Sequence, residues 1–361
     1  MDFSEYTGPS KEWLELERQL PAPPPNLTTA QLKEATNNGR EEIAAKELIE
    51  QGLASKVTLA DFTIPTRDGA SIEARSYRPV GVDASQRLPI FLYLHGGGFL
   101  FGTLSSEDSA CARIVTTLAE QNFPIVVVNV NYRHTPEHKY PTAWDDTEDA
   151  FHWLHDHLSG IGGDGARLLM GGVSAGAWLT ASTALAQSTG NNRELAARPK
   201  IRGQVLIIPP LVHYQCYDPI MKQIRDPSVS SWVENRDAPI LPYDRMVLFT
   251  SLLGVTGGKE KESDLRLNPG NARPEDVVGL PPATFGVAGL DPLRDEGLLW
   301  AKLLAENGVP TQTNVFTGVP HGFRRYGSKL TASEKWDETI VDGIKWALSG
   351  PAPGPFKINA F

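Results

Sequence analysis

The chain has 361 residues and a formal net charge of −9; 40% of its residues are hydrophobic and 21% are charged. This composition is typical of a globular protein that is large enough for one α/β domain with a cap, or for two domains. The negative balance gives no electrostatic basis for binding nucleic acid or an anionic membrane surface. No apolar run approaches the roughly 20 residues that cross a bilayer.

The beginning of the chain and its cysteines bear on the cellular compartment. Met1-Asp2-Phe3-Ser4-Glu5 is acidic and lacks the basic and apolar regions of a secretory signal. Cys111 and Cys216 are the only cysteines, too few for a disulfide framework, and we interpret them as reduced thiols with a packing role. We therefore predict a cytoplasmic protein with a small-molecule partner, no nucleic-acid partner and no integral membrane association. A homodimer is an alternative to a monomer that the sequence leaves open.

Residues 1–55 are polar and contain two helical patterns. They run near Lys11–Leu20 and over Thr28–Gln51, and the proline-rich break Pro21-Ala22-Pro23-Pro24-Pro25 separates them. A segment this short and polar cannot hold a hydrophobic core of its own. We expect it to lie across the rest of the molecule as the N-terminal part of a helical cap.

From Val57 onward the hydrophobic period changes to two, and apolar strands then alternate with helical patterns. Two early runs joined by Arg67-Asp68-Gly69 predict a β-hairpin. The predicted strands are Val57–Ile64, Ser71–Tyr77, Ile90–Leu94, Ile125–Val130, Leu168–Val173, Val205–Ile208, Thr284–Val287 and Gln312–Phe316. The predicted helices are Ser106–Gln121, Ala143–His157, Ala175–Ser188, Asp295–Asn307 and Ala332–Leu348. This alternation predicts an α/β fold with a mostly parallel central sheet, helices on both faces and an antiparallel edge.

One stretch interrupts the alternation. Residues 211–266 contain no clear strand, are rich in Pro and Asp, and include an apolar segment at Tyr243–Leu253. Their position between two core strands predicts a cap insertion over the mouth of the sheet. The α/β core then comprises residues 56–210 and 267–348. Residues 349–361 are expected to form a C-terminal tail, draped or mobile.

A Gly-X-Ser-X-Gly pentapeptide, Gly172-Val173-Ser174-Ala175-Gly176, lies between a predicted strand and a predicted helix. In this setting a serine hydroxyl projects from a tight turn near the helix N-terminus, and the glycines permit close packing of strand and helix. The pentapeptide by itself also occurs by chance. Its place between strand and helix makes Ser174 the candidate nucleophile.

A serine hydroxyl needs a base, and the base needs an acid that orients it. Asp291 and His321 each come just after a late predicted strand, so both reach the edge of the sheet at which ligands gather. The order Ser174, Asp291, His321 matches one known order of catalytic triads. Asp295 is the rival acid. We assign it instead to the start of the following helix, which it can cap.

The segment His95-Gly96-Gly97-Gly98-Phe99 follows a predicted strand. Successive glycines let backbone N–H groups meet an oxyanion without obstruction by side chains. Together with the N–H after the nucleophile they provide candidate donors at Gly97, Gly98 and Ala175. A phosphate cradle would also use such glycines, but no Lys-Ser or Lys-Thr pair follows them.

Five blocks, taken in order, resemble those of the hormone-sensitive-lipase-like carboxylesterases. They are His95–Phe99, Tyr132–His138 followed by Pro141, the Ser174 pentapeptide, Asp291-Pro292-Leu293 and His321-Gly322-Phe323. The resemblance spans about residues 56–348 and implies an α/β-hydrolase fold, with a helical cap built from the N-terminus and an insertion. It also implies no cofactor and hydrolysis of esters with short to medium acyl chains. The positions that match the family's triad and oxyanion hole are those already named.

The sequence departs from the family pattern in three places. Val173 stands before the nucleophile where an Asp is usual, and Ala177 and Trp178 follow the pentapeptide. The second block has His134-Thr135 where Leu-Ala is usual. These changes remove no catalytic group and bear on substrate range. Trp178 lies one helical turn after Ser174 and either lines the pocket or, as we favour, packs between helix and sheet.

Apolar side chains near the predicted mouth would form an acyl or aryl pocket. The candidates, together with Trp178, are Phe99, Leu100, Phe101, Leu211, Tyr214 and Phe323. The three histidines between 152 and 157 lack the rest of a metal-binding motif, so we interpret them as part of a polar helix face and predict no metal. We interpret His134 as a loop histidine with a structural hydrogen bond, not as a second base.

We therefore predict a serine hydrolase of the carboxylesterase type, which cleaves esters of short to medium, apolar acyl or aryl groups through an acyl-enzyme intermediate. A specialised biosynthetic enzyme on the same triad is the alternative: a thioesterase, lactonase, amidase, acyltransferase or cyclase. A ligand receptor without catalytic activity is disfavoured, because such a protein would usually lack a triad member and all three are present.

Overall fold

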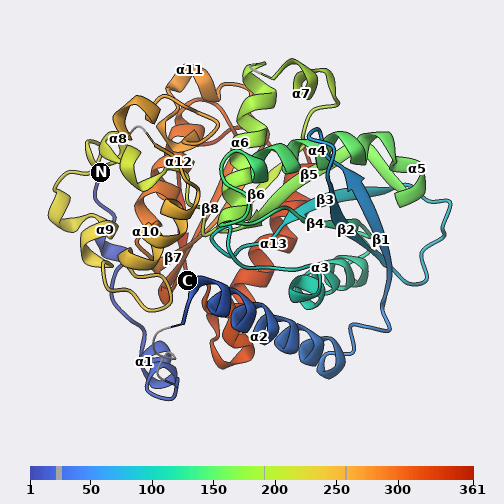
Figure 1. Cartoon of the computed structure of the whole chain (residues 1–361), viewed down its shortest axis with the longest axis horizontal. Coiled ribbons are helices and arrows are strands. Elements are labelled where there is room, and N and C mark those ends of the chain that lie inside the picture. The colour runs from blue at the N-terminus through green and yellow to red at the C-terminus, as the bar shows by residue number, and fades with distance from the viewer. Residues whose placement is uncertain (22–26, 191, 257) are drawn as a thin grey trace.

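A nine-stranded sheet forms the centre of the molecule (Figure 1). The computed structural model describes residues 1–21, 27–190, 192–256 and 258–361. The strands follow the order β1-β2-β4-β3-β5-β6-β7-β8-β9. They are β1 (Val57–Pro65), β2 (Ser71–Pro79), β3 (Leu88–Leu94), β4 (Val126–Asn131), β5 (Gly163–Val173), β6 (Gln204–Ile207), β7 (Ala283–Leu290), β8 (Thr311–Pro320) and β9 (Ile358–Ala360). The pairings β1–β2 and β2–β4 are antiparallel and all others are parallel, in agreement with the predicted mostly parallel sheet with an antiparallel edge.

Helices cover both faces of the sheet. The longer ones are α2 (Thr29–Glu50), α3 (Asp108–Glu120), α4 (Thr142–Asp156), α6 (Ala175–Thr189), α10 (Tyr243–Leu252), α12 (Arg294–Glu306) and α13 (Ala332–Leu348). The shorter ones are α1 (Lys11–Glu17), α5 (Leu158–Ile161), α7 (Arg193–Ala197), α8 (Asp218–Met221), α9 (Ser231–Glu234) and α11 (Pro274–Val277). Helices α3 and α13 pack on one face, and α4, α6 and α12 pack on the other. Because both faces are covered, β3 and β7 are buried along their whole length and read as continuous apolar runs.

The N-terminal segment lies across the core through two helices. Trp13 of α1 is fully buried and packs against Tyr326, with ring centroids 5.7 Å apart. Thr28 begins α2 with a capping box, because its hydroxyl accepts from the Gln31 N–H and its own N–H donates to the Gln31 side chain. Only Ala44 of α2 is buried, so this helix is held by polar contacts. Most of the predicted proline-rich break lies outside the described residues.

The insertion folds into short helices, and its anchor is polar. The Ser231 N–H of α9 donates to Asp295 at 2.7 Å, and the Asn235 side chain donates to the backbone oxygens of Gly289 and Asp291. The first residues of the chain meet the same insertion, because the Arg225 N–H donates to the Met1 carbonyl at 2.7 Å. Residues 1–55 and the insertion at 211–266, which the sequence predicts to lie at the mouth of the sheet, therefore contact each other.

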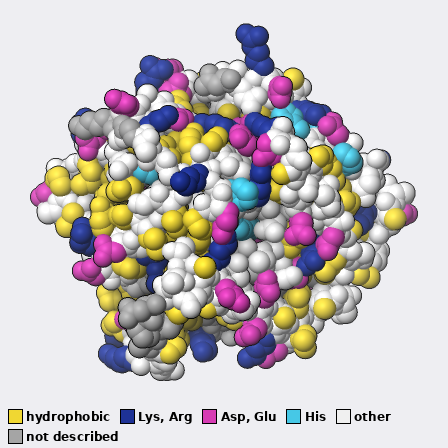
Figure 2. Space-filling view, viewed as in Figure 1, with side chains coloured by type: hydrophobic (Ala, Val, Ile, Leu, Met, Phe, Trp, Pro, Cys, Tyr) yellow, Lys and Arg dark blue, Asp and Glu magenta, His cyan; other side chains and the backbone are white. Residues whose placement is uncertain are grey.

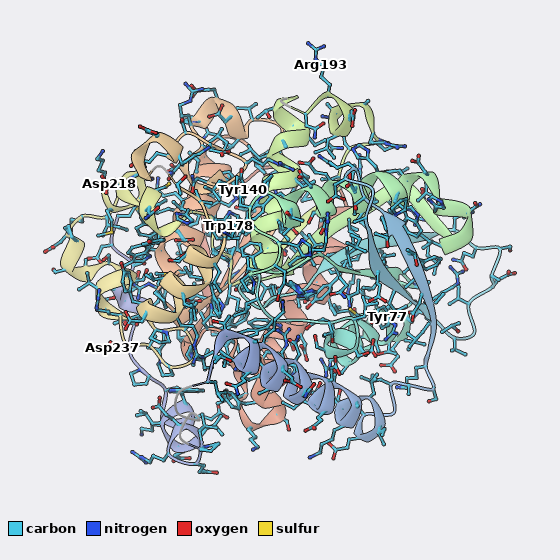
Figure 3. The ribbon with its side chains drawn as sticks, in the orientation of Figure 1. Tyr77, Tyr140, Trp178, Arg193, Asp218 and Asp237 are labelled. Atoms are coloured by element: carbon cyan, nitrogen blue, oxygen red, sulfur yellow. The ribbon has the colours of Figure 1, made fainter. Side chains whose placement is uncertain are left out.

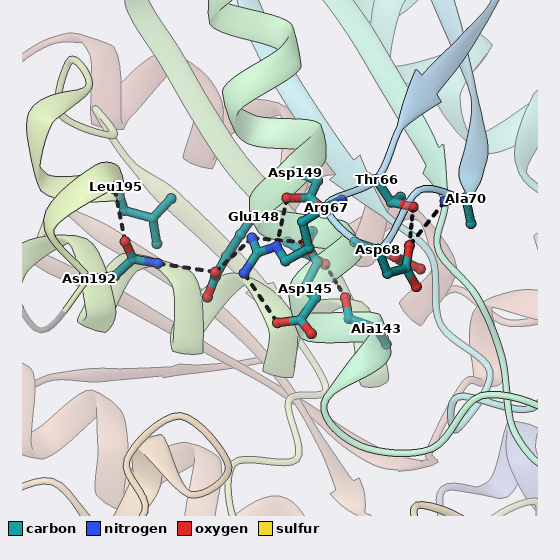
Figure 4. Close-up of polar contacts among 12 residues, drawn as sticks. Thr66, Arg67, Asp68, Ala70, Ala143, Asp145, Glu148, Asp149, Asn192 and Leu195 are labelled. Atoms are coloured by element: carbon teal, nitrogen blue, oxygen red, sulfur yellow. Dashed lines mark hydrogen bonds and ion pairs between the residues drawn. The ribbon is translucent and has the colours of Figure 1, made fainter.

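The β1–β2 hairpin is tied to the helical layer by Arg67 (Figure 4). Its guanidinium donates to Asp149 at 2.8 Å and to Glu148 at 3.0 Å, both on α4. Asn192, at the start of α7, donates to the same Glu148 carboxylate. Because Glu148 is buried, these donors compensate a charge that would otherwise be costly to remove from water.

The C-terminal tail differs from the prediction. Residues 358–360 form β9, which extends the sheet beside β8, and the Thr317 N–H donates to the Phe361 carbonyl. A three-residue strand is too short to produce a hydrophobic period, so the sequence pattern did not reveal it.

The visible surface carries mixed charge. In the face that Figure 2 shows, acidic and basic side chains are interspersed, and hydrophobic side chains gather in the left half, where Figure 1 places α8, α9 and α10. Over the described part of the chain, no helix combines the length and the apolar character that crossing a bilayer would require.

Candidate active site

Ser174 occupies a strained turn between β5 and α6. Its backbone has φ 51° and ψ −118°, and its N–H donates to the Ile207 carbonyl of β6 at 2.8 Å. The glycines on either side are required by packing. A Cβ built on Gly172 would lie 2.3 Å from the Leu94 carbonyl oxygen, and one built on Gly176 would lie 1.9 Å from the same atom. The end of β3 therefore presses directly against the turn that presents the hydroxyl.

Ser174, His321 and Asp291 form one hydrogen-bonded chain. His321 Nε2 lies 3.0 Å from the Ser174 hydroxyl oxygen, and His321 Nδ1 lies 2.7 Å from an Asp291 carboxylate oxygen. Asp291 follows β7 and His321 follows β8, so the parallel order of the strands brings both to the same edge. All three side chains are buried or nearly so. The arrangement provides a nucleophile, a base that can take its proton and an acid that fixes the tautomer of the base.

Asp295 does not contact His321 and makes its hydrogen bonds elsewhere. Its carboxylate accepts from the Ser231 N–H and, at 2.9 Å, from the Arg294 guanidinium, so it links the start of α12 to α9 of the insertion. Asp291 is held from the other side, because its second carboxylate oxygen accepts from the Leu293 N–H at 3.0 Å. Of the two candidate acids, the structure brings Asp291 to His321.

The glycine segment after β3 faces the hydroxyl. Gly97 and Gly98 have φ of 140° and 61°, backbone that favours glycine. Among the described residues neither of their N–H groups has a backbone or side-chain acceptor, and Ala175 is the first residue of α6, whose N–H has no partner within the helix. Gly98 and Ala175 line the same cavity as Ser174. These groups can donate to an oxyanion formed beside the serine.

Helix α2 holds the glycine segment from outside. The Arg40 guanidinium donates to the Gly96 carbonyl at 3.0 Å and also to the buried Glu107 carboxylate. The Asn37 side chain accepts from the Gly102 N–H at 2.9 Å. The sequence prediction missed these residues, because nothing in the pattern of a polar amphipathic helix marks which side chains reach another segment.

Two histidines fill the space behind the glycine segment. The His95 ring stacks on Tyr132 with centroids 4.4 Å apart, and the His134 ring meets both at 5.1 Å. Burial lowers the pKa of His95 to about 4, and burial also holds the pKa of His134 well below its usual range. Both rings are therefore neutral at pH 7. Among the described residues the His134 ring makes no hydrogen bond, although its backbone carbonyl accepts from the His138 N–H, and its Nε2 is buried without a partner. Ring packing therefore holds the side chain where the sequence suggested a hydrogen bond.

A buried carboxyl lies close to the triad acid. Glu296 on α12 accepts from the Leu211 N–H at 2.5 Å. Burial raises the pKa of Glu296 well above its usual range, and the negative charge of Asp291 raises it further. The hydrogen bond from the Leu211 N–H ties α12 to the segment after β6.

A cavity beside Ser174 is lined mainly by apolar side chains. It contains about 430 Å³ of empty space, including its open mouth. Three of the predicted pocket residues line it: Phe99, Trp178 and Tyr214. The sequence missed the others, which are Pro210, Val212, Leu241, Met246, Phe249, Thr250 and Leu293. Four of these come from 241–250, within or beside the apolar segment of the insertion that the sequence singled out without assigning a role.

Trp178 lines the cavity and also packs in the interior, against the segment after β3 and against α4. It is 1% exposed, and its indole N–H donates to the Leu267 carbonyl at 2.6 Å. Its ring packs edge-on against Phe99 and Trp144, while one part lines the cavity. Figure 3 places it near the middle of the molecule.

The other four predicted pocket residues lie outside the cavity lining. Phe323 lies in the core between Phe316 and Trp336, with centroid distances of 5.4 and 5.3 Å. Leu100 and Leu211 are fully buried. Phe101 packs edge-on against Phe249, a lining residue, and so supports the wall from behind. Proximity in sequence to a catalytic block does not determine the direction of a side chain.

A larger hollow, of about 880 Å³ with its open mouth, lies away from Ser174. It is lined by Arg67, Glu148 and Arg266, among others, and these side chains bond one another, as Figure 4 shows in part. It holds no member of the hydrogen-bonded chain, so we place the chemistry in the smaller cavity. Within the part of the chain that the structure describes, no group of three or more His, Cys, Asp or Glu side chains could hold a metal ion.

Comparison with known proteins now identifies the family. The family model described as alpha/beta hydrolase fold matches residues 91–325. The chain is 34% identical over 299 residues to carboxylesterase NlhH of Mycobacterium tuberculosis, covering 82% of this chain and 85% of that protein. It is 31% identical over 296 residues to ethyl acetate hydrolase of Pseudomonas putida, covering 80% and 83%. The protein belongs to the hormone-sensitive-lipase-like carboxylesterases.

Solved structures agree with this family. The crystal structure of vibralactone cyclase aligns with the carboxylesterase at a TM-score of 0.81, with 25% identity over 96% of each chain. The α/β-hydrolase fold that the sequence predicts is therefore confirmed. In this carboxylesterase the glycine segment, the serine turn and the histidine all lie within the residues that the family model covers.

Proposed function

We propose that this carboxylesterase hydrolyses esters at Ser174, with His321 as base and Asp291 as the acid that orients it. The observation that carries the proposal is the hydrogen-bonded chain Ser174–His321–Asp291, at 3.0 and 2.7 Å. It lies beside backbone N–H groups of Gly97, Gly98 and Ala175, for which the described residues provide no acceptor. The named relatives favour ester hydrolysis over the specialised alternatives and over a receptor without activity.

The mechanism follows from this geometry. The Ser174 oxygen attacks the ester carbonyl carbon while His321 Nε2 takes the hydroxyl proton, and Asp291 stabilises the resulting imidazolium. The carbonyl oxygen becomes an oxyanion and accepts from the backbone donors. His321 then protonates the leaving alcohol oxygen, which departs and leaves the acyl group on Ser174. Water attacks the acyl-enzyme with His321 again as base, and this releases the acid and restores the serine.

The cavity supports short to medium, apolar acyl or aryl groups as substrates. The cavity lining is mainly apolar, so the cavity stabilises a bound hydrocarbon group by removing that group from water. Phe249 and Trp178 are large side chains that limit its length. We therefore expect short acyl groups to be accepted beside Ser174 and long chains to extend through the mouth of the cavity.

The cap is part of the proposal. We assign residues 1–55 and 211–266 to the cap, 56–210 and 267–348 to the core, and 349–361 to the tail. Support comes from α2, whose Arg40 holds the glycine segment, and from α10, whose Met246 and Phe249 line the cavity. Cap contacts on both sides would exclude water from the reacting ester.

We also propose a cytoplasmic location. Cys111 and Cys216 are both buried free thiols, which is typical of proteins in a reducing compartment. Fractionation of the source cells tests this proposal. The homodimer stays a prediction, which mass determination in solution would test.

Replacement of Ser174 tests the assignment of the nucleophile. We expect Ser174→Ala to lower kcat for p-nitrophenyl acetate by about 10⁴- to 10⁶-fold, because the covalent route is lost while the donors and the cavity persist. A fluorophosphonate probe should label the wild type and not the variant. The matched control is Ser182→Ala on the same helix, whose hydroxyl donates to the Arg266 carbonyl away from the site. Undiminished hydrolysis by Ser174→Ala would refute the proposal.

A further inference from the structure

The turn that carries the triad acid, residues 289–295, leaves the sheet before it reaches the acid. β6 pairs with β7 only as far as Ile207 and Gly286, so no described strand covers that side of the end of β7. The pairing of β7 with β8 is also irregular between Ala288 and Leu290. All residues of this acid turn are buried. Its backbone carbonyl groups therefore need hydrogen-bond donors from outside the sheet.

Asn235, at the end of α9 in the insertion, supplies two of these donors. Its side-chain amide donates to the Gly289 carbonyl at 3.2 Å and to the Asp291 carbonyl at 3.1 Å. The amide group has two N–H donors, so one side chain can satisfy both carbonyls. Asn235 is 5% exposed, so water has little access to replace it. This side chain therefore joins the end of β7 to the triad acid.

Ser231 contacts the other part of the acid turn. It lies four residues before Asn235, which places both side chains on the same side of α9. The Ser231 hydroxyl donates to the Pro292 carbonyl at 2.7 Å and accepts from the Asp295 N–H at 3.2 Å. Ser231 is fully buried. Two buried side chains of the insertion thus hold the acid turn from its first residue to its last.

The catalytic contact of Asp291 depends on the backbone of this turn. One carboxylate oxygen lies 2.7 Å from His321 Nδ1, and the other accepts from the Leu293 N–H at 3.0 Å. Both contacts require the backbone at 291–293 to keep its position. A buried carbonyl that loses its donor is unfavourable, so the turn would rearrange to find another partner. Such a rearrangement would move the carboxylate away from the imidazole.

We propose that Asn235, with Ser231, is a positioning residue for the triad acid. The insertion fixes the backbone of the acid turn, and the turn fixes the Asp291 carboxylate against His321. Among the described residues neither side chain hydrogen-bonds to Ser174 or His321, so both act through Asp291. The insertion then supports the triad in addition to lining the acyl cavity. This inference rests on the proposed function of the same site.

Replacement of Asn235 tests the proposal. We expect Asn235→Leu, which keeps the size of the side chain and removes both donors, to lower kcat for p-nitrophenyl acetate by about 10- to 100-fold. KM should change less than about threefold, because Asp291 stabilises the imidazolium of the transition state and does not bind the substrate. Asn235→Gln, which keeps the amide, should restore part of kcat. Ser231→Ala should also lower kcat and provides a second variant should Asn235→Leu fail to fold.

A double variant separates action through Asp291 from a general structural effect. If Asn235 acts only by holding the carboxylate, Asn235→Leu should lower kcat by less than about threefold once Asp291→Asn has removed that carboxylate. A distorted cavity or a partly unfolded protein would instead lower kcat by the same factor in both backgrounds. Urea unfolding of each variant establishes that the protein assayed is folded.

Asn271 offers a matched control in the same part of the chain. Its side-chain amide also donates to two backbone carbonyls, those of Cys216 at 3.1 Å and Glu262 at 3.2 Å, and neither belongs to the acid turn. Asn271→Leu therefore removes the same kind of contact without touching Asp291. We expect it to lower resistance to urea while kcat stays within about threefold of the wild type.

The outcomes separate the positioning role from the hydrolytic function. An unchanged kcat in folded Asn235→Leu overturns the positioning role, and so does an equal loss in the Asp291→Asn background or in Asn271→Leu. If the wild type hydrolyses no p-nitrophenyl ester and takes no fluorophosphonate label, the proposed hydrolytic function fails. If the wild type is active and Asn235→Leu keeps its kcat, only the positioning role fails.

Discussion

Ser174 adopts a backbone conformation that costs a residue with a side chain about 1–3 kcal/mol. The surroundings impose it through the N–H bond to Ile207 and through close contacts at Gly172 and Gly176. The two candidate acids also have different surroundings although they are close in the sequence. Asp291 and Asp295 are four residues apart and both are buried, yet one faces the imidazole and the other the insertion. Their roles are therefore separable by mutation.

Replacing each acid by its amide distinguishes catalysis from structure. We expect Asp291→Asn to lower kcat for p-nitrophenyl acetate by about 10⁴-fold, because an amide no longer holds the imidazole in the productive tautomer. Asp295→Asn should lower kcat less than about tenfold and reduce the free energy of unfolding by about 1–3 kcal/mol, because a buried charged acceptor is lost. Urea unfolding and steady-state kinetics on both variants check this. A larger loss of kcat in Asp295→Asn than in Asp291→Asn would assign the catalytic acid to Asp295.

At the scale of elements, the site is built by segments that belong to different parts of the chain. The strands β5, β7 and β8 deliver the three side chains of the hydrogen-bonded chain, whereas α2 and α10 approach from outside the sheet. A Cβ built on Gly98 would lie 2.3 Å from the Phe249 ring of α10, so this helix packs directly on the glycine segment after β3. The side chains of α10 should therefore set the room available to the acyl group.

Shortening one side chain of α10 tests this. We expect Phe249→Ala to shift the preferred p-nitrophenyl ester toward longer acyl chains, since removing the ring enlarges the cavity beside Ser174. Hydrolysis of the shortest ester should fall severalfold, because the acyl group then fits loosely. An acyl-chain series provides the measurement, and Leu248→Ala, on the same helix and outside the cavity lining, is the control. An unchanged profile for Phe249→Ala would exclude α10 as the wall of the acyl site.

At the scale of the whole molecule, buried neutral histidines make stability depend on pH. His95 has a folded-state pKa of about 4, below the 6.5 of the free side chain, because burial disfavours its charged form. Between these values the unfolded chain binds a proton that the folded protein does not. The contribution of this residue to stability is therefore present above pH 6.5 and is lost as the pH falls toward 4.

Equilibrium unfolding in urea at several pH values measures this loss. From His95 alone we expect the free energy of unfolding to fall by about 2 kcal/mol between pH 7 and pH 5. His134, whose pKa is also lowered by burial, acts in the same direction. His95→Asn should be less stable at pH 7 but should show a shallower fall. An equally steep fall in that variant would assign the pH dependence to other groups.

Much of the fold and of the site follows from the sequence, because local patterns carry the relevant information. The buried strands are continuous apolar runs, and α13 has the predicted bounds Ala332–Leu348. The triad candidates each follow a strand, and parallel strands place their carboxyl ends on one edge. That rule is sufficient to bring Ser174, Asp291 and His321 together without knowledge of any other contact.

Other features depend on contacts between distant segments, which no local period encodes. Phe323 adjoins the catalytic block yet points into the core, because the turn after His321 directs it toward Trp336. The apolar wall from α10 and the support from Arg40 arise from contacts between these helices and segments that are remote in the chain. The sequence by itself determined the order of elements and the candidate reacting groups. The tertiary structure decided which side chains line the cavity beside Ser174, because side-chain direction depends on packing across elements that are remote in the chain.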